Sequence, residues 1–259
     1  MGTEYLPALE GVSWSEELNQ NNHLSKELQR AFKREKIDLK IIKKESDEQT
    51  KYELFQRLNT FGSSLSDQEV RNCLLIMIDK SFYEWVKSLA NHNSFLEVLT
   101  ITDRQFDEQY HLELLLRYLI LKDVNPQDVK NIPDLSDYIT REIKSIAADP
   151  SFDRATAEQE FRKTFDILYQ ALGDNAFRKF QGQKYTGGFS LSIYEVIALG
   201  LGKYVSNYEI SCNQDLEKIK NISENLHSNP RYTSKSGTGY KASNRLPFIL
   251  PLAWELFEK

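Results

Sequence analysis

The sequence predicts a mainly α-helical protein, a multi-helix domain with one short β-strand near residues 37–44. Apolar residues recur at three- and four-residue spacing along most of the chain, and helix-start signals precede several of these runs. The alternation that is typical of a strand is clearest at Ile37, Leu39 and Ile41. These observations together favour a helical fold that has very little sheet.

Composition limits the function classes. The chain has 259 residues and a net charge of −5, so it carries no overall basic signature for nucleic acid, and any such contact needs a local patch. Two scattered cysteines indicate a reducing compartment rather than a disulfide scaffold. There is neither a signal peptide nor an apolar run of about 20 residues, the length of a membrane span. We therefore expect a cytoplasmic protein with no membrane partner.

The first 45 residues predict a lead-in helix and the strand. Leu24, Leu28 and Phe32 give a helix over Leu24–Lys36, and the strand follows it. A lone strand needs a partner, which another domain would supply. Lys40, Lys43 and Lys44 lie on or beside the strand and give it a basic edge. The ordinary alternative is that they are solvated edge charges that discourage strand pairing.

The stretch from Tyr52 to Asn72 predicts a helix, then a tight break, and then a second helix. Asn59-Thr60-Phe61-Gly62 ends the first helix, because glycine readily takes the left-handed conformation found after helix ends. Ser66 and Glu69 form a capping box that begins the second helix, which runs to about Asp79. Its core face is Val70, Cys73, Leu74, Met77 and Ile78.

Polar residues that packing does not require surround this break. A helix N-terminus offers unpaired N–H groups and partial positive charge, so the cluster could bind an anion. The ordinary interpretation of these residues is that they are backbone caps and solvated charges. The cluster consists of Arg57, Asn59, Thr60, Ser63, Ser64, Arg71 and Asn72.

The same stretch resembles the signature of the ParB-like DGQQR-motif proteins, the GmrS-type half of the GmrSD restriction enzymes. The pattern F-x-R-x-N-T-x-G-x-x-L-x-x-x-E-x-R-N is met by Phe55, Arg57, Asn59, Thr60, Gly62, Leu65, Glu69, Arg71 and Asn72. The resemblance extends over residues 5–11, 24–34 and 107–118. Two family features are missing. The usual second glycine of the turn is replaced by Phe61 or Ser63, and no Asp-Gly-Gln-Gln-Arg pentapeptide occurs in this chain.

The resemblance implies a helical portion of a nucleotide-dependent nuclease of bacterial restriction and anti-phage defence, inactive without its DGQQR segment. Residues 1–45 would be the junction with an absent ParB-like domain, and residues 46–259 the helical domain, with 46–125 and 126–259 as candidate subdomains. The complete protein would use a nucleoside triphosphate and a divalent metal, and DNA or a nuclease subunit would be its partner. The implied nucleotide- or phosphate-binding residues are Arg57, Asn59, Thr60, Gly62, Arg71 and Asn72.

Further helices are predicted along the rest of the chain. Thr102 and Gln105 form a second capping box that begins a helix to about Leu121. Arg117 on that helix could approach the signature turn or snorkel at the domain edge. Leu191–Val205 is apolar on nearly every side and predicts a buried central helix, in which Gly200 and Gly202 allow close helix contact.

The C-terminal segment is locally basic. No acidic residue occurs from Asn225 to Trp254, while Arg231, Lys235, Lys241 and Arg245 do. Together with the hydroxyl- and glycine-rich loop over residues 233–240, they suit phosphate contacts with nucleic acid. The alternative is an ordinary surface loop. We expect Pro247 and Pro251 to bend or interrupt the last helix.

No catalytic mechanism follows from the residues alone. The four histidines are isolated, and no ligand spacing predicts a metal site. Two function classes therefore remain: the helical part of a GmrS-like nuclease, or a non-catalytic helical scaffold that binds other proteins.

Overall fold

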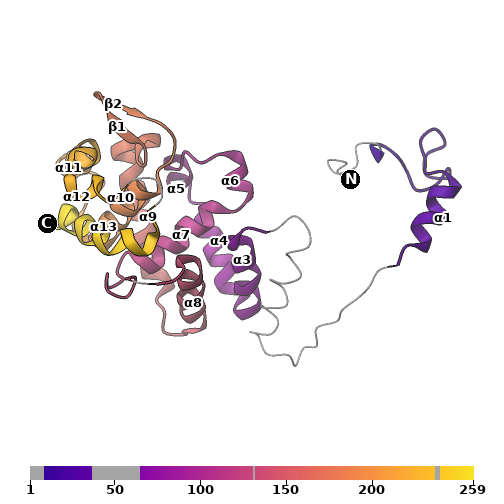
Figure 1. Cartoon of the computed structure of the whole chain (residues 1–259), viewed down its shortest axis with the longest axis horizontal. Coiled ribbons are helices and arrows are strands. Elements are labelled where there is room, and N and C mark those ends of the chain that lie inside the picture. Colours follow the sequence, from indigo (N-terminus) through magenta and orange to yellow (C-terminus); the bar gives the residue numbers. More distant parts are fainter. Residues whose placement is uncertain (1–8, 37–64, 131, 237–239) are drawn as a thin grey trace. The chain divides into compact units, whose positions relative to one another are not determined.

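The computed structural model describes residues 9–36, 65–130, 132–236 and 240–259 (Figure 1). The chain forms two compact units, Met1–Asp47 and Glu48–Lys259. The predicted strand near residues 37–44 and the predicted turn from Asn59 to Gly62 lie outside the described residues.

The first unit contains one described helix, α1 (Lys26–Arg34). Ser25 caps it by accepting a hydrogen bond from the backbone N–H of Leu28. The ring of Phe32 packs edge-on against Trp14, with 5.4 Å between the ring centroids. None of the residues of α1 is buried, so this helix contributes little to any hydrophobic core.

The second unit is an assembly of helices with one small hairpin, and it confirms the mainly α prediction (Figure 1). Its longer helices are α3 (Asp67–Ile78), α4 (Lys80–Ala90), α7 (Tyr110–Leu121), α8 (Leu135–Ala148), α9 (Arg154–Leu172), α10 (Leu191–Lys203), α11 (Asn213–Asn225) and α13 (Ala242–Phe257). Its shorter elements are α5 (Asn93–Val98), α6 (Asp103–Asp107), α12 (Pro230–Thr233), β1 (Lys179–Gln181) and β2 (Lys184–Thr186).

Helix α10 is the centre of the core, as its apolar sequence predicts. Every residue from Ile193 to Gly202 is buried. A Cβ atom on Gly200 would lie 2.5 Å from the Phe257 ring of α13, and one on Gly202 would lie 2.4 Å from the Tyr118 ring of α7. The two glycines therefore permit α13 and α7 to pack closely against α10, as the sequence predicts.

Aromatic rings fill the space between α9, α5 and α7. Phe161 and Phe165 lie one helical turn apart on α9, with ring centroids 4.6 Å apart. Phe165 also packs edge-on against Phe95, and the Tyr118 hydroxyl lies 2.8 Å from the Thr164 hydroxyl. One continuous core thus runs through both candidate subdomains.

The predicted helix from Thr102 to Leu121 is two helices instead of one. The Thr102–Gln105 capping box is present and begins α6. Gln109 then adopts the left-handed conformation, with φ of 61°, and α7 begins after it. A non-glycine residue with positive φ breaks the helical ladder, and nothing in the periodicity marks this position.

Two C-terminal features also differ from expectation. Helix α13 continues through Pro247 and Pro251 without interruption, because its packing against α10 outweighs the two missing backbone hydrogen bonds. The β1–β2 hairpin interrupts a stretch of chain for which no strand was predicted, and its turn places Gly182 and Gln183 at positive φ. Among the described residues, no helix is long and apolar enough to cross a bilayer.

Candidate functional site: a buried arginine network

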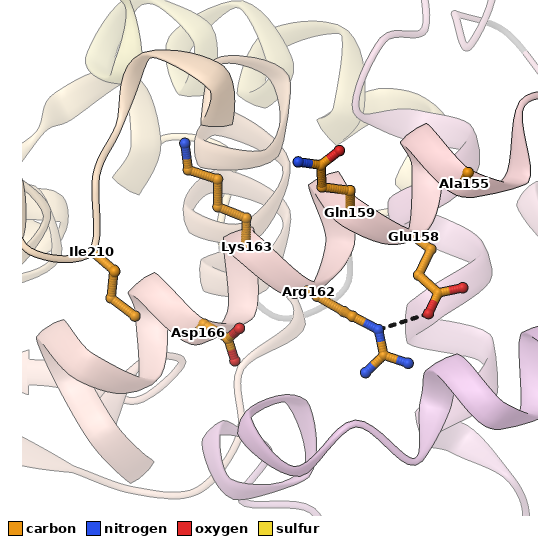
Figure 2. A pocket seen from close by; sticks show the side chains of 7 residues that line it. All are labelled: Ala155, Glu158, Gln159, Arg162, Lys163, Asp166 and Ile210. Carbon is orange, nitrogen blue, oxygen red and sulfur yellow. Dashed lines mark hydrogen bonds and ion pairs between the residues drawn. The ribbon is translucent and has the colours of Figure 1, made fainter.

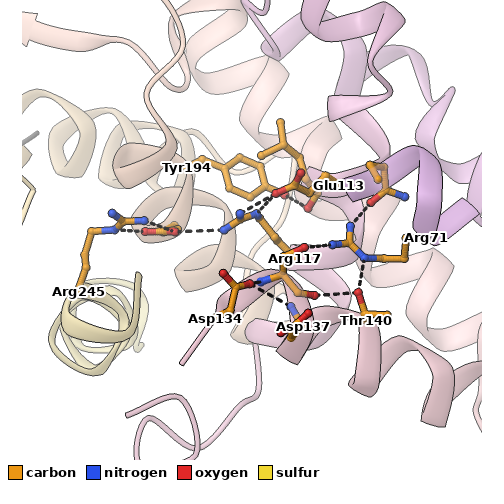
Figure 3. Close-up of polar contacts among 12 residues, drawn as sticks. Arg71, Glu113, Arg117, Asp134, Asp137, Thr140, Tyr194 and Arg245 are labelled. Atoms are coloured by element: carbon orange, nitrogen blue, oxygen red, sulfur yellow. Dashed lines mark hydrogen bonds and ion pairs between the residues drawn. The ribbon is translucent and has the colours of Figure 1, made fainter. Parts of the chain in front are cut away.

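A buried carboxylate on the central helix organises the polar interior of the second unit. Glu195 on α10 is fully buried among apolar neighbours. It accepts two hydrogen bonds from Arg245 of α13, Nε to Oε2 at 2.7 Å and Nη2 to Oε1 at 2.8 Å (Figure 3). This two-bond geometry is the strong form of an arginine–carboxylate pair.

A second arginine, Arg117 of α7, approaches the same carboxylate. Its Nη1 lies 3.7 Å from Glu195 Oε1, and its Nε and Nη2 donate to Glu113 Oε1 at 2.9 and 2.6 Å (Figure 3). Burial acts to lower the pKa of Arg117, but the charges of Glu113 and Glu195 outweigh it and raise that pKa. The guanidinium therefore stays charged inside the protein.

The network contains two arginines and two glutamates, so its formal charges cancel. Arg117 neither snorkels at the domain edge nor leaves its guanidinium in water, since its side chain is only 11% exposed. Arg117 Nη1 has no hydrogen-bond partner among the described residues. This donor lies 3.7 Å from Glu195 Oε1, beyond hydrogen-bond distance.

Tyrosine rings border this cluster. Burial raises the pKa of Tyr110 to about 12. The Tyr194 hydroxyl donates to the backbone oxygen of Leu114 at 2.7 Å (Figure 3). Both phenols therefore stay neutral at physiological pH and act as rigid packing groups.

Arg71, one of the predicted phosphate-binding residues, forms a second buried polar centre. It is 1% exposed and joins α3 to α8. Its Nε donates to Thr140 Oγ1 at 3.1 Å, its Nη2 donates to Ser136 Oγ at 2.8 Å, and its Nη1 donates to Gln68 (Figure 3).

The local sequence explains this placement. Asp134 caps α8 through the backbone N–H groups of Ser136 and Asp137. Ser136 and Thr140 are one turn apart, so their hydroxyls lie on one face of α8. Arg71 in the first half of α3 reaches both of them.

The other described signature residues also stabilise the start of α3. Ser66 and Glu69 form the predicted capping box, and the Ser66 hydroxyl also donates to the backbone oxygen of Glu108 at 3.0 Å. Asn72 accepts a hydrogen bond from Gln68 Nε2 at 2.7 Å. Of the six predicted phosphate-binding residues, Arg57, Asn59, Thr60 and Gly62 lie outside the described residues.

The four cations of the C-terminal segment occupy different environments. Arg245 forms an ion pair with the buried Glu195, and Arg231 forms one with Glu255 at 2.7 Å on the surface. Lys241 is exposed and is the N-cap residue that precedes α13. Lys235 lies over the Phe248 ring, 4.5 Å from its centroid, and lines a groove with Lys130.

A separate groove of about 540 Å³ lies along α9 (Figure 2). Arg162 pairs with Glu158 at 2.8 Å, and Asp166 pairs with His92 at 2.7 Å. His92 Nδ1 faces Arg162 Nη1 at 3.0 Å, so both ring nitrogens are engaged. Because its charges are matched in pairs, this groove offers no unopposed group for a ligand.

The described residues contain no group of three histidine, cysteine, aspartate or glutamate side chains that could hold a metal ion. We therefore assign no metal-binding role to any of them. The signal that sequence reasoning missed is Glu195, the one charged residue between Leu191 and Gly202 in an otherwise apolar helix.

Comparison with protein-family models, curated proteins and solved structures gives no match. The resemblance to GmrS-type proteins therefore rests on the sequence of this chain alone, in the signature and the stretches that flank it.

Proposed function

We propose that this chain is the helical portion of a GmrS-like, ParB-related restriction protein that handles a nucleoside triphosphate or a phosphodiester. The observation that carries the proposal is the signature from Phe55 to Asn72, whose second half begins α3. In this proposal the turn from Arg57 to Gly62 contacts phosphate, and Asn59 and Thr60 orient the turn or the ligand.

The geometry of α3 supports this reading in one respect. Glu69, Arg71 and Asn72 are each engaged in contacts that stabilise the N-terminal half of the helix. A rigid helix start is the feature that a phosphate-binding turn requires, because its N–H groups must be held in place. Arg71 then has a positioning role, while Arg57 has the binding role.

Catalysis in this proposal depends on the Asp-Gly-Gln-Gln-Arg motif, which this chain lacks. The test joins or co-expresses the chain with a DGQQR-bearing ParB-like segment and measures nucleotide hydrolysis and DNA cleavage. We expect activity that Arg57→Ala abolishes and that Arg104→Ala, a change at an 87% exposed side chain, leaves intact. Activity that is indifferent to Arg57 would overturn the site assignment.

The second candidate function is a non-catalytic helical scaffold. It is favoured by the burial of Arg71 and Arg117, whose guanidinium groups bond within the protein. Such a scaffold forms a stable complex with another protein and shows no nucleotide effect on its thermal unfolding. Isolation of a stoichiometric complex with unchanged unfolding temperature in nucleotide would support it.

A further inference from the structure

A groove of about 370 Å³ combines unopposed positive charge with exposed aromatic rings. It lies between the turn that follows α7 and the N-terminal half of α13. The described residues that line it are Gln127, Lys130, Lys235, Tyr240, Ser243, Asn244, Pro247 and Phe248. None of these eight side chains is acidic.

Lys235 is held by the two rings of the groove. Its Nζ lies 4.5 Å from the Phe248 centroid and 5.8 Å from the Tyr240 centroid. Cation–π contacts of this kind position an ammonium without using its N–H donors. Neither Lys235 nor Lys130 pairs with a carboxylate among the described residues.

The rings of this groove are also exposed. Phe248 is 55% exposed and Tyr240 is 43% exposed. The adjacent residues Ile249 and Leu250 are fully buried in the core, so α13 could fold with a polar residue at position 248. An exposed ring beside two ammonium groups is the combination on which bases stack while phosphates are neutralised.

Three other grooves along the described residues lack this combination. The groove on α9 contains Glu158, the one beside the hairpin contains Glu224, and the one on α11 contains Glu217. Each of these three grooves therefore has a carboxylate in its lining that opposes its positive charge. The Lys130–Lys235 groove also offers the Gln127 and Asn244 side chains, whose amides both donate and accept hydrogen bonds.

We propose that this groove binds a nucleoside phosphate unit, with phosphate against Lys130 and Lys235, the base on Phe248 and Tyr240, and polar edges of the nucleoside against Gln127 and Asn244. The unit could belong to single-stranded nucleic acid or to a free nucleotide, which share this chemistry. The inference rests on the proposed function for its biological setting, but it uses none of the residues of the predicted Arg57–Gly62 turn.

The test uses the full chain and a fluorescent oligothymidine of about 16 nucleotides, the upper site size of one compact binding domain. Fluorescence anisotropy measures its binding, and unlabelled AMP serves as competitor. Strong competition by AMP identifies a free nucleotide as the ligand. Tight binding of the oligomer with weak competition by AMP identifies a single strand.

Three variants locate the binding. Phe248→Leu keeps an apolar side chain but removes the ring, and we expect at least about tenfold weaker binding. Phe248→Tyr keeps the ring, so it should bind as the natural chain does. Lys130→Gln combined with Lys235→Gln should lower the slope of log affinity against log salt by about 0.7 for each lost phosphate contact.

Lys220→Gln, an exposed lysine of α11 outside the groove, is the matched control and should leave affinity unchanged within about twofold. Unaltered binding and salt slope in both Phe248→Leu and the double lysine variant, or no binding by the natural chain, would overturn the inference. Arg57→Ala should leave oligomer binding intact, so loss of binding in that variant alone would place the ligand at the turn instead.

Discussion

Glu195 and Arg245 are joined by two hydrogen bonds, at 2.7 and 2.8 Å, that connect the central helix α10 to the C-terminal helix α13. Glu195 is fully buried, and Arg117 approaches it from α7. Three helices that are far apart in the sequence therefore depend on one carboxylate.

Replacing Glu195 by Gln should destabilise the protein strongly. The change leaves Arg245 and Arg117 facing a neutral amide inside the core, and removing one partner of a buried pair costs about 3–5 kcal/mol. Denaturant unfolding measures this loss as a lower midpoint. Glu255→Gln, at the exposed pair with Arg231, is the control and should change stability by less than about 1 kcal/mol. Equal effects of the two changes would contradict the structural role of the network.

Arg71→Lys should also destabilise the protein, although it keeps the charge. A lysine cannot reproduce the planar fork that donates to Ser136, Thr140 and Gln68. We expect a loss of about 1–3 kcal/mol in the free energy of unfolding, measured with urea. Arg104→Lys, at an exposed position, should be nearly neutral, and a neutral Arg71→Lys would show that the buried bonds do not hold α3 to α8.

Gly202→Ala should lower the thermal midpoint. Its Cβ would lie 2.4 Å from the Tyr118 ring, and either this buried ring or α7 must move to admit it. Overpacking of this kind costs about 1–3 kcal/mol, more than the helix propensity that alanine gains. Gly188→Ala, where no atom lies within 4 Å of the added Cβ, is the matched control. A stabilised Gly202→Ala protein would refute the close α7–α10 contact.

Protonation of His111 should lower the stability of the protein as the pH falls from about 6.5 to about 4. This ring is buried against Phe106, with centroids 4.2 Å apart, and burial lowers its pKa from 6.5 to about 4. The unfolded chain takes up a proton below pH 6.5, whereas the folded chain does so only near pH 4. His111→Leu should therefore shrink the stability difference between pH 7 and pH 5 by roughly 1–2 kcal/mol. Urea unfolding at the two pH values measures it, and an unchanged difference would exclude His111 as the cause.

The sequence predicts the local features of this fold well. Both predicted capping boxes are present, at Ser66–Glu69 and at Thr102–Gln105. They are predictable because such a box depends on residues only three positions apart. The apolar run around Ile193 also depends only on neighbouring residues, and it correctly predicts a buried helix. The break at Gln109 escapes prediction, because a left-handed glutamine carries no sequence signal.

The polar partners are not predictable from a single sequence. Arg71 meets Thr140, 69 residues away, and Arg245 meets Glu195, 50 residues away. Such pairs form only when packing brings separate helices together. The basic C-terminal segment of the sequence already singles out Lys235. Only the folded structure shows that Lys130 and Phe248 line the same groove. The Arg57–Gly62 turn stays a prediction, since it lies outside the described residues.

The most direct test of the central claim is thermal unfolding of the chain with and without a magnesium nucleoside triphosphate. The natural chain and Phe248→Leu, which lacks the ring of the proposed groove, should both unfold at a higher temperature in the presence of nucleotide, because the ligand binds only the folded state. Arg57→Ala made in the Phe248→Leu chain should lose this shift, because neither site then binds the nucleotide. No shift in the natural chain, or a shift that survives Arg57→Ala and disappears in Phe248→Leu, would contradict a phosphate site at the signature turn.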